Sequence, residues 1–450
     1  MKFMLNRRNF IKNAILGGTA LASINALADD ISAFVRKGKS RTQKFNMHGY
    51  AAPRIDDLRI GVIGLGGRGF MGISRFHLFE GARTVAICDI VREKIDKIEK
   101  YLAEKKLPKA ASYCGNDEEF KKLCDRDDID LVFIATPWKW HVPMAEYAMN
   151  AGKHVAVEVP AARTLEEAWR LVEASERTKK HCFMLENCVY DFFESATINM
   201  AIDGVLGDLI HAEGAYIHKI IQALPKKETW RWEENNKSGN LYPTHGLGPV
   251  SLAMGINRGD SFDYMTSMSS DDFTWLKNAK RAKEEVPSIP LFDKYRGNIN
   301  SSLIRTKKGR TIVLQHDVSS PRPYDRRHIL SGTDGFVQKY PSQTIFLGGK
   351  ELSKEDSSKI LKKYSPETII KIGEFAKKIG GHGGMDTIMV YRLIHCLRNG
   401  LPLDMDVYDA AAWSAVTPLS IWSVANRSAP ADFPDFTAGA WQTTKPQKLS

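Results

Sequence analysis

Cysteine is scarce in this sequence, and the few residues present form no metal motif. There are six in 450 residues, with no Cys-x-x-Cys pair. Cys88 ends one apolar run and Cys182 begins another, which is typical of thiols that pack as small apolar side chains. A chain that folds in a reducing compartment needs no disulfides. We therefore expect no bound metal and no disulfide framework.

Long hydrophobic runs and blocks of like charge are also missing. The apolar stretch 14–22 is too short and too rich in Gly and Ala to span a membrane. Formal net charge is +11, of which four positive charges lie in residues 1–28. The remaining excess is spread along the chain, so we expect no nucleic-acid site. With 43% hydrophobic and 26% charged residues, the composition is that of an ordinary globular protein. A chain of this length can form two domains.

The N-terminus has the pattern of an export signal rather than of a folded segment. Arg7-Arg8-Asn9-Phe10-Ile11-Lys12 precedes the apolar stretch, and Ala26-Leu27-Ala28 is a small-x-small cleavage site. The twin arginines indicate the twin-arginine route, which carries folded proteins; the alternative is an ordinary secretory signal with two chance arginines. No cysteine follows the cleavage site, so we expect no lipid anchor. The prediction is a signal peptide at 1–28, a linker or arm at 29–54, and a periplasmic or secreted protein.

Strand and helix patterns alternate through the first half of the mature chain. This alternation predicts a doubly wound parallel sheet, the Rossmann type of α/β fold, over residues 55–180. The expected strands are 60–64, 84–89, 131–135 and 154–158, and the expected helices 91–104, 118–124, 142–151 and 165–179.

The character of the sequence changes after residue 185. Alternating segments at 210–217, 300–306, 311–317 and 336–339 predict a large, mostly antiparallel sheet within an α+β substrate domain at 181–450. We expect the open face of this sheet to lie against the nucleotide domain, and an open sheet face to serve as a surface for a homodimer. A helix is predicted over 385–398, because Asn399-Gly400 and Pro402 supply its stop.

A glycine fingerprint follows the first strand directly. In Gly64-x-Gly66-x-x-Gly69 the first glycine permits a tight turn, the second lets backbone approach a pyrophosphate, and the third allows close helix–strand packing. Asp89, at the end of the next strand, can accept hydrogen bonds from a ribose and repels a 2′-phosphate, which favours NAD over NADP. The alternative is a glycine-rich turn in another kind of α/β protein. The expected dinucleotide contacts here are Gly64, Leu65, Gly66, Gly67, Arg68, Gly69 and Asp89.

Two further loops follow predicted strands and should meet the cofactor at the same sheet edge. They are Thr136-Pro137-Trp138-Lys139-Trp140-His141 and Glu158-Val159-Pro160. Together with the fingerprint they resemble the oxidoreductase superfamily named for glucose–fructose oxidoreductase and inositol dehydrogenase. In its ordinary dehydrogenases the middle residue of the tripeptide is a lysine that assists proton transfer. Val159 cannot move a proton, which weakens a polyol dehydrogenase interpretation.

Additional motifs resemble glycoside hydrolase family 109, whose members are NAD-dependent α-N-acetylgalactosaminidases. The similarity runs from about Leu58 to near the C-terminus and includes the leader. The most specific block is Tyr242-Pro243-Thr244-His245-Gly246-Leu247-Gly248-Pro249. The others are Glu213-Gly214-Ala215-Tyr216, Trp230-Arg231-Trp232 and Pro321-Arg322-Pro323-Tyr324.

The resemblance implies a redox-neutral hydrolysis that differs from the two-carboxylate scheme. Enzyme-bound NAD would oxidise the sugar C3 hydroxyl, a base would remove the acidified C2 proton, and the C1 leaving group would be eliminated. Water would then add, and the hydride would return to C3, with retained anomeric configuration. Because the cofactor is regenerated at every turnover, a protein exported in its folded form with NAD bound would not need to exchange it.

The resemblance also implies roles for individual residues. His245 and Tyr242 are the candidates for proton transfer, with Tyr324 as a second acid/base or substrate contact. The substrate set is Tyr216, Arg231, Tyr242, Pro243, Thr244, His245 and Tyr324. The nicotinamide half of NAD would meet Trp138, Lys139, Trp140, His141, Glu158, Val159 and Asn187.

Alternatives remain open for some residues and for the function. Arg231 could be a stacked surface arginine, Tyr216 a sheet residue and Tyr324 a rigid-turn residue. His382, in a glycine-rich segment, lacks the spaced partners of a metal ligand. Two other functions fit the same features: a sugar or polyol oxidoreductase of the superfamily, and a non-catalytic sugar sensor that holds NAD.

Overall fold

The computed structural model describes residues 31–221 and 229–450, which form two sheets with helices between and around them. The predicted export signal lies outside these residues. The first sheet has six parallel strands in the order β3-β2-β1-β4-β5-β6. Their bounds are β1 (Leu58–Ile63), β2 (Ala82–Cys88), β3 (Ala111–Tyr113), β4 (Leu131–Ile134), β5 (His154–Val157) and β6 (Cys182–Met184).

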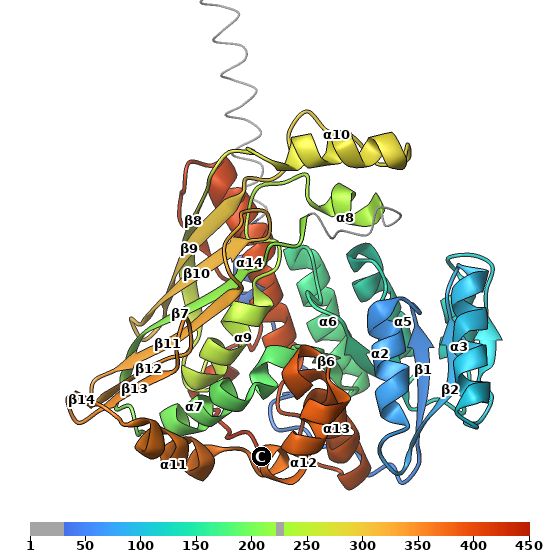
Figure 1. Ribbon diagram of the computed structural model, residues 1–450, viewed down its shortest axis with the longest axis horizontal. Helices are drawn as coiled ribbons and strands as arrows, with labels where there is room; N and C mark the ends of the chain where they lie inside the picture. Colours follow the sequence, from blue (N-terminus) through green and yellow to red (C-terminus); the bar gives the residue numbers. More distant parts are fainter. Residues whose placement is uncertain (1–30, 222–228) are drawn as a thin grey trace, which may run out of the picture.

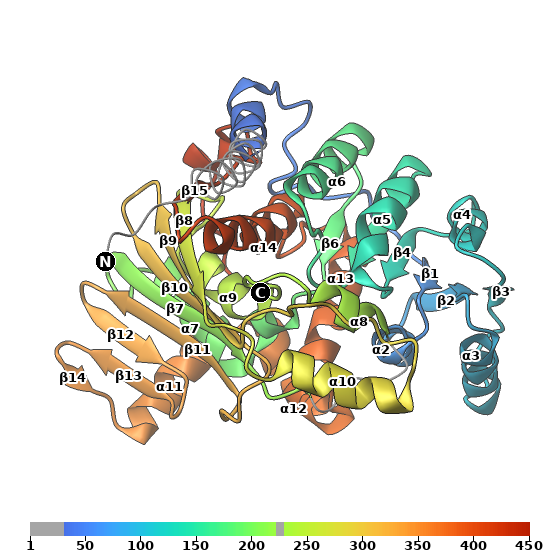
Figure 2. The same ribbon diagram turned by 90° about the horizontal axis from the view of Figure 1, so that it is seen from above.

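Helices cover both faces of the parallel sheet, which is why its central strands are continuous apolar runs. Helices α4, α5 and α6 lie on one face, and α2, α3 and α13 lie on the other (Figure 2). The Rossmann arrangement is therefore confirmed. The bounds are α2 (Gly67–Phe76), α3 (Arg92–Glu104), α4 (Glu119–Cys124), α5 (His141–Asn150) and α6 (Leu165–Thr178).

The parallel sheet extends further along the chain than predicted. Strand β6 pairs in parallel with β5, with Val155 opposite Cys182. The boundary expected after residue 180 therefore separates the last strand from its own sheet and belongs after Met184. The short run Cys182–Met184 resembles the start of a new domain in sequence because the polar segments that follow it carry no βαβ pattern.

The second sheet has nine strands in the order β14-β13-β12-β11-β7-β10-β9-β8-β15. Only β7 and β10 pair in parallel, so the prediction of a mostly antiparallel sheet is confirmed. The bounds are β7 (Leu209–Ile217), β8 (Phe262–Ser269), β9 (Ile299–Thr306), β10 (Thr311–Asp317), β11 (Asp325–Gly332), β12 (Gly335–Gln338), β13 (Thr344–Leu347), β14 (Lys350–Glu351) and β15 (Ala431–Asp432).

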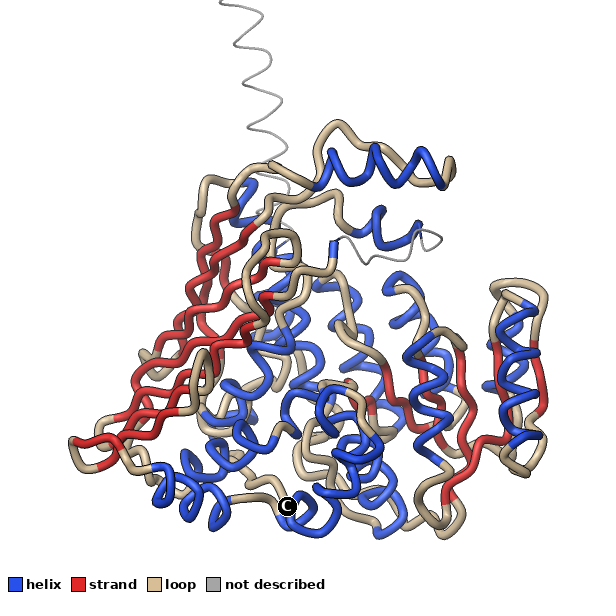
Figure 3. The backbone as a smooth tube through the Cα atoms, in the orientation of Figure 1, coloured by secondary structure: helices blue, strands red, loops and turns tan. Residues whose placement is uncertain are grey.

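Helices separate the two sheets. Helices α7, α9 and α14 pack on the inner face of the nine-stranded sheet, between it and the parallel sheet (Figures 1 and 3). The expectation that the open face lies against the nucleotide domain is therefore wrong, because helices cover that face. The uncovered face is the opposite one, where Met268 and Leu303 are exposed. The remaining helices are α7 (Phe192–Ile202), α8 (Thr229–Glu234), α9 (Thr244–Ala253), α10 (Trp275–Glu285), α11 (Lys354–Tyr364), α12 (Glu367–Ile379), α13 (Met385–Asn399) and α14 (Val407–Ala425).

The segment predicted as a linker or arm is ordered along its described part. Residues 31–40 are helical, and the chain then packs on α6 and α14. His48 Nδ1 lies 2.7 Å from Asp406 Oδ2, and the Gln43 amide donates to the Tyr408 hydroxyl (2.7 Å). This arm therefore connects the two helices rather than only joining the leader to the fold.

All six cysteines are unpaired thiols, and five of them are buried. No helix in the described ranges 31–221 and 229–450 is long and apolar enough to cross a membrane.

Candidate functional site

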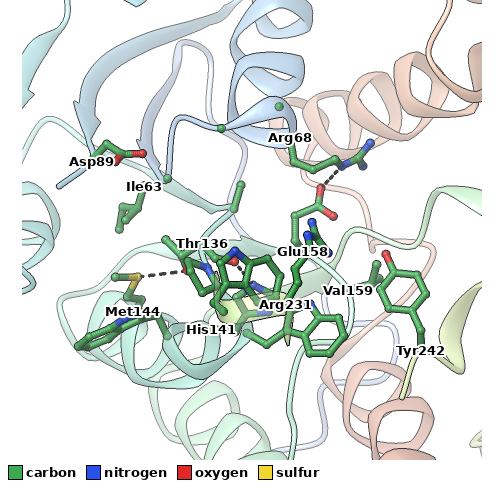
Figure 4. Close-up of a pocket in the computed structure, with 18 of the residues that line it drawn as sticks. Ile63, Arg68, Asp89, Thr136, His141, Met144, Glu158, Val159, Arg231 and Tyr242 are labelled. Atoms are coloured by element: carbon green, nitrogen blue, oxygen red, sulfur yellow. Dashed lines mark hydrogen bonds and ion pairs between the residues drawn. The ribbon is translucent and has the colours of Figure 1, made fainter. Parts of the chain in front are cut away.

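One cavity of about 670 Å³ runs from the glycine turn of the parallel sheet to the inner face of the nine-stranded sheet. Its first part is lined by Gly64, Gly66 and Asp89, and its far part by Tyr216, His245 and other residues of the second domain. Figure 4 shows Asp89 and Arg68 near the turn and Tyr242 facing Val159. The nucleotide site and the candidate sugar site are therefore parts of one space.

The glycine turn has the shape that a dinucleotide needs. Gly64 has φ +86°, and a Cβ there would lie 2.5 Å from the Ala135 carbonyl oxygen. A Cβ on Gly69 would lie 1.9 Å from the Gly64 carbonyl oxygen, so the start of α2 packs directly on the end of β1. A Cβ on Gly66 would meet nothing within 4 Å, which leaves room for a pyrophosphate at the uncapped helix N-terminus.

Asp89 is held in place by backbone donors. Its Oδ2 accepts a hydrogen bond from the Leu65 amide (2.7 Å) and its Oδ1 from the Val91 amide (2.9 Å). Lys94 Nζ lies 3.6 Å from Asp89 Oδ2, and both residues line the cavity. The carboxylate is thus fixed at the β2 end, where the adenine ribose of a dinucleotide lies.

Arg68 joins the glycine turn to two carboxylates. Its Nε donates to Glu158 Oε1 (2.7 Å), and its Nη1 donates to Asp386 Oδ1 (3.1 Å). The amide of Asn187 donates to the same oxygen of Asp386 (2.7 Å), and His382 Nδ1 lies 2.8 Å from the other. Burial opposes ionisation of Asp386, but these donors outweigh it and hold its pKa well below the usual range.

Burial acts in the other direction on Glu158. It raises the pKa of this carboxyl group despite the contact with Arg68. His382 lines the cavity, although the sequence indicated no role for it beyond a place in a glycine-rich segment. Its partner Asp386 is only four residues further along the chain. Metal-ligand spacing around His382 was considered in the sequence, and a carboxylate partner was not.

The loop after β4 contributes aromatic rings. The Trp138 ring is stacked near Tyr242 (centroids 6.0 Å apart) and meets Trp230 edge-on (5.6 Å). Trp140 also lines the cavity, whereas Lys139 is exposed and does not. His141 is fully buried and bridges the Pro160 and Thr136 carbonyl oxygens at 2.8 and 2.9 Å. It therefore ties two cofactor loops together.

A close backbone approach places the candidate acid/base residues. A Cβ on Gly214 of β7 would lie 2.2 Å from the Gly246 carbonyl oxygen, so only glycine lets α9 press onto the strand here. As a result, Tyr216 and His245 lie with their ring centroids 5.2 Å apart. Tyr242 lies 4.9 Å from His245 and 5.0 Å from Tyr216. The three rings form one wall of the cavity.

His245 has a buried carboxylate partner that the sequence did not reveal. Its Nδ1 lies 2.7 Å from Oε1 of Glu186, which is completely buried. This contact fixes the ring and leaves Nε2 as the nitrogen for a ligand. Burial alone would raise the pKa of Glu186, but the charge and hydrogen bond of His245 lower it. Glu186 lies two residues after β6, much as Glu158 lies directly after β5. The available signal in the sequence was thus a carboxylate just beyond a short apolar run.

The phenols of this wall are in their neutral form. Burial raises the pKa of Tyr242 well above its ordinary value and also raises the pKa of Tyr216. The Tyr216 hydroxyl lies 3.0 Å from His218 Nδ1. Both phenols are consequently proton donors rather than bases at neutral pH.

Several predicted site residues do not line the cavity. The Tyr324 hydroxyl accepts a hydrogen bond from Arg326 (2.7 Å), and its ring lies 5.0 Å from His218. His218 therefore lies between Tyr324 and the cavity wall, where it contacts Tyr216. The others outside the lining are Leu65, Gly69, Lys139, Pro243 and Thr244, whereas Gly64, Gly66, Gly67, Arg68, Asp89, Trp138, Trp140, His141, Glu158, Val159, Asn187, Tyr216, Arg231, Tyr242 and His245 belong to it.

One group of potential metal ligands occurs in the described part of the chain. Atoms of Glu186, Cys188 and His245 lie within 4.8 Å of one another. The direct contact of His245 with Glu186 takes up two of these ligands, and burial raises the pKa of Cys188 well above its usual value, which opposes a thiolate. The expectation of no metal stays a prediction.

The far end of the cavity contains the predicted Arg231 and three residues that sequence reasoning missed. Arg231 stacks on Trp230, with its guanidinium carbon 4.3 Å from the ring centroid. Beyond it lie Trp275 at the start of α10, Arg296 before β9, and His316 on β10. These three come from segments without motifs, and only the fold brings them to the cavity.

Known protein families match both halves of the chain. Residues 58–186 match the family described as oxidoreductase family, NAD-binding Rossmann fold. Residues 190–443 match the C-terminal domain of glycosyl hydrolase 109.

Curated relatives match over most of their length. A glycosyl hydrolase family 109 protein of Porphyromonas gingivalis is 46% identical over 412 residues, covering 87% of each chain. One of Shewanella baltica is 45% identical over 459 residues, covering 98% of each.

Solved structures share the fold at low sequence identity. An aldose–aldose oxidoreductase of Caulobacter crescentus, complexed with glycerol, superposes with a TM-score of 0.61 at 19% identity, over 84% of this chain and all of that one. An inositol dehydrogenase homologue of Azotobacter vinelandii, complexed with NADH and myo-inositol, gives 0.61 at 17% identity, over 87% and 100%.

Proposed function

The chain belongs to glycosyl hydrolase family 109, and we propose that it removes terminal α-linked N-acetylgalactosamine from glycans by a redox-neutral, NAD-dependent cycle. Its first half matches the NAD-binding oxidoreductase family, and its second half matches the C-terminal domain of glycosyl hydrolase 109. The observation that carries the proposal is that His245, whose Nδ1 contacts the buried Glu186, lines the same cavity as the dinucleotide turn.

The residues around the nicotinamide end favour this cycle over net oxidation. Val159 lines the cavity at the position where ordinary dehydrogenases of the oxidoreductase superfamily have a lysine. A valine side chain has no proton to transfer. His245, Tyr242 and Tyr216 supply acid/base and hydrogen-bonding groups from the other wall instead. Proton chemistry is thus concentrated on the sugar side of the cavity.

Each residue has a defined task in this proposal. Bound NAD supplies a hydride acceptor for C3 that is restored within the same cycle, so that C2 becomes acidic while C3 is a ketone. His245 Nε2 takes the C2 proton, and Glu186 stabilises the imidazolium that results. Tyr242, kept neutral by burial, donates a hydrogen bond to the C3 oxygen as negative charge develops there. The C1 substituent then leaves, water adds at C1 as the protonated His245 returns a proton to C2, and the configuration is retained.

The cofactor part of the cavity keeps the redox partner in place. Asp89 is positioned for the adenine ribose, and Arg68 links the pyrophosphate turn to Glu158 and Asp386 beside the nicotinamide half. We propose that the protein acquires NAD before export by the twin-arginine route and acts in the periplasm. A cofactor that is regenerated at each turnover needs no periplasmic supply.

The test follows aglycone release and NADH absorbance together. The purified protein, without added NAD, is incubated with a panel of α- and β-linked aryl glycosides in deuterium oxide. We expect release only from the α-N-acetylgalactosaminide, deuterium at C2 of the freed sugar, and no accumulation of NADH. Retention of the C2 hydrogen would rule out the elimination step even if hydrolysis occurred.

The same assay separates the two other candidate functions. Net accumulation of NADH with a free sugar would identify an oxidoreductase. A His245→Ala variant addresses the sensor: a glycosidase loses turnover while retaining NAD, whereas a sensor has no turnover to lose.

A further inference from the structure

Arg296 lies at the far wall of the cavity and is 1% exposed. Its guanidinium makes four hydrogen bonds, all with neutral acceptors. Nη2 donates to His316 Nδ1 (2.7 Å) and to the Gly239 carbonyl oxygen (3.3 Å). Nη1 donates to Asn235 Oδ1 (3.3 Å) and Nε to the Gly297 carbonyl oxygen (3.5 Å). These contacts fix the plane of the group but supply no negative charge.

No carboxylate of the described residues forms an ion pair with Arg296. Asp317 acts on it through space, but its Oδ1 accepts hydrogen bonds from the Ser319 and Ser320 amides (3.0 and 2.9 Å) and its Oδ2 accepts one from the Ser320 hydroxyl. Three other buried arginines of this chain do have direct carboxylate partners: Arg258 with Asp406 and Asp409, Arg326 with Asp191 and Glu194, and Arg392 with Asp404.

A buried cation without a counter-charge is costly unless something supplies one. Burial lowers the pKa of Arg296 to about 9, so the guanidinium is still charged at neutral pH. Trp275 offers a partial compensation, with its ring centroid 5.9 Å from the guanidinium carbon. Arg296 borders the cavity, so a ligand there can supply the missing negative charge.

His316 provides a second, independent feature. Because its Nδ1 accepts a hydrogen bond from Arg296, its Nε2 carries the proton. That Nε2 is buried and has no partner in the residues that the structure describes, although the side chain lines the cavity. Burial, followed by the charge of Arg296, keeps the pKa of His316 well below its ordinary value. The wall thus offers a fixed cation and a fixed neutral donor.

We propose that Arg296 and His316 form a subsite for an anionic oxygen group, a carboxylate or a sulfate ester, carried by the substrate. The proposal rests on the glycosidase function and names its substrate class: acidic rather than neutral N-acetylgalactosaminides. The Tyr216 ring lies 6.0 Å from the His316 ring and 5.2 Å from His245. The anion is therefore separated from the reacting carbons by about the width of a ring, on C6 of the sugar or on the leaving group.

The test compares matched neutral and anionic ligands on the NAD-loaded protein. Calorimetry measures binding of N-acetylgalactosamine and its 6-O-sulfate, which tests the sugar position. The kcat/KM values of phenyl and 4-carboxyphenyl α-N-acetylgalactosaminides test the leaving-group position. In at least one pair we expect the anionic member to be favoured about tenfold or more.

Variants assign the preference to the subsite. In Arg296→Gln the preference for the anionic member of each pair, measured as the ratio of affinities or of kcat/KM values, should disappear. Arg296→Lys should retain part of this preference. Arg305→Gln removes the same charge from an exposed position on β9 and should leave the ratio unchanged. Because ratios are compared between variants, the different reactivity of the two phenols cancels.

Two results would overturn the proposal: equal affinities and rates in both pairs for the wild-type protein, or a preference that persists in Arg296→Gln. Loss of folding in Arg296→Gln leaves the wild-type comparison and the lysine variant as the decisive measurements. If no aryl glycoside is cleaved, the glycosidase function fails, and the calorimetric pair still decides whether the anion subsite exists.

Discussion

In the proposed cycle, Glu186 is the residue that orients His245 as the base. The carboxylate is completely buried and contacts the imidazole through Nδ1, which leaves one defined nitrogen for the sugar. Since Glu186 does not line the cavity, it acts on the substrate only through His245. It is a positioning residue whose charge, as well as its shape, matters.

Replacing Glu186 by Gln should lower kcat about a hundredfold with little change in KM, because the imidazolium loses its counter-charge while the ring keeps a hydrogen-bond acceptor. The acidic limb of the kcat/KM profile should move to lower pH. Glu213→Gln, which changes a partly exposed carboxylate on β7, is the matched control. An unchanged pH profile in Glu186→Gln would contradict the positioning role.

The sequence reveals residues whose partners are close along the chain and misses those whose partners are distant. The glycine turn and Asp89 form a local pattern, and the Leu65 amide binds Asp89 across only 24 positions. Glu186 and His245 are 59 positions apart, and Arg68 and Asp386 are 318 apart. Without the fold, nothing links such pairs. Tyr324 shows the opposite error, because a motif residue can support the site from outside it.

At the scale of elements, the β1–α2 turn separates two roles of glycine. Gly69 is required by packing, since a Cβ would meet the Gly64 carbonyl oxygen at 1.9 Å. Gly66 is required by the ligand, since the protein itself leaves its Cβ position empty and its φ of −68° suits any residue.

Gly66→Ala should therefore keep the melting temperature and weaken NAD binding at least tenfold, whereas Gly69→Ala should lower both. Thermal unfolding and fluorescence titration with NAD measure the two properties separately. Gly204→Ala, at a solvent-exposed turn outside the site where φ is +73°, should show the reverse pattern, with a lower melting temperature and unchanged NAD affinity. Unchanged NAD affinity in Gly66→Ala would place the pyrophosphate elsewhere.

The alternation of strands and helices was predictable because, like the glycine turn, it is encoded in local sequence patterns. Strands β1, β4 and β5 are apolar runs buried on both faces, and α6 has a Thr164 cap and an amphipathic pattern. Strand β6 was assigned to the wrong domain because three residues carry no periodicity. The inner helices α7, α9 and α14 were not predicted to separate the sheets, since helices that are apolar on most sides have no distinct face.

For the whole molecule, buried histidines determine how stability depends on pH. Burial lowers the pKa of His181 and of His328 to about 4, from an ordinary value near 6.5. Between these values the unfolded chain binds protons that the folded chain excludes. This contribution is favourable above about pH 6.5 and is lost as the pH falls toward 4.

The free energy of unfolding should thus fall by roughly 1 kcal/mol per pH unit for each such histidine across this window. Urea unfolding at pH 7 and pH 5 measures the effect. His181→Phe keeps the ring contact with Tyr50 and should flatten the pH dependence. His211→Asn on the outer sheet face is the control and should leave the slope as it is.

The outer face of the nine-stranded sheet is the surface for the expected homodimer, which stays a prediction. Leu303 and Met268 are 60% and 67% exposed on adjacent strands, an apolar pair that a second copy would cover. Leu303→Glu should convert the dimer to a monomer in sedimentation analysis. Phe273→Glu, at an exposed site outside the strands, should not. A monomeric wild-type protein would contradict the expectation.

Because Lys94 forms an ion pair with Asp89, one substitution should be enough to change the cofactor preference from NAD to NADP. The cation that a 2′-phosphate requires already lies 3.6 Å from the carboxylate that repels it. Asp89→Ser should strengthen NADP binding and weaken NAD binding, and a further Lys94→Ala change should cancel the gain; unaltered selectivity in Asp89→Ser would contradict this assignment. A single codon would thus decide which of the two cofactors the protein takes up, with the rest of the pocket unchanged.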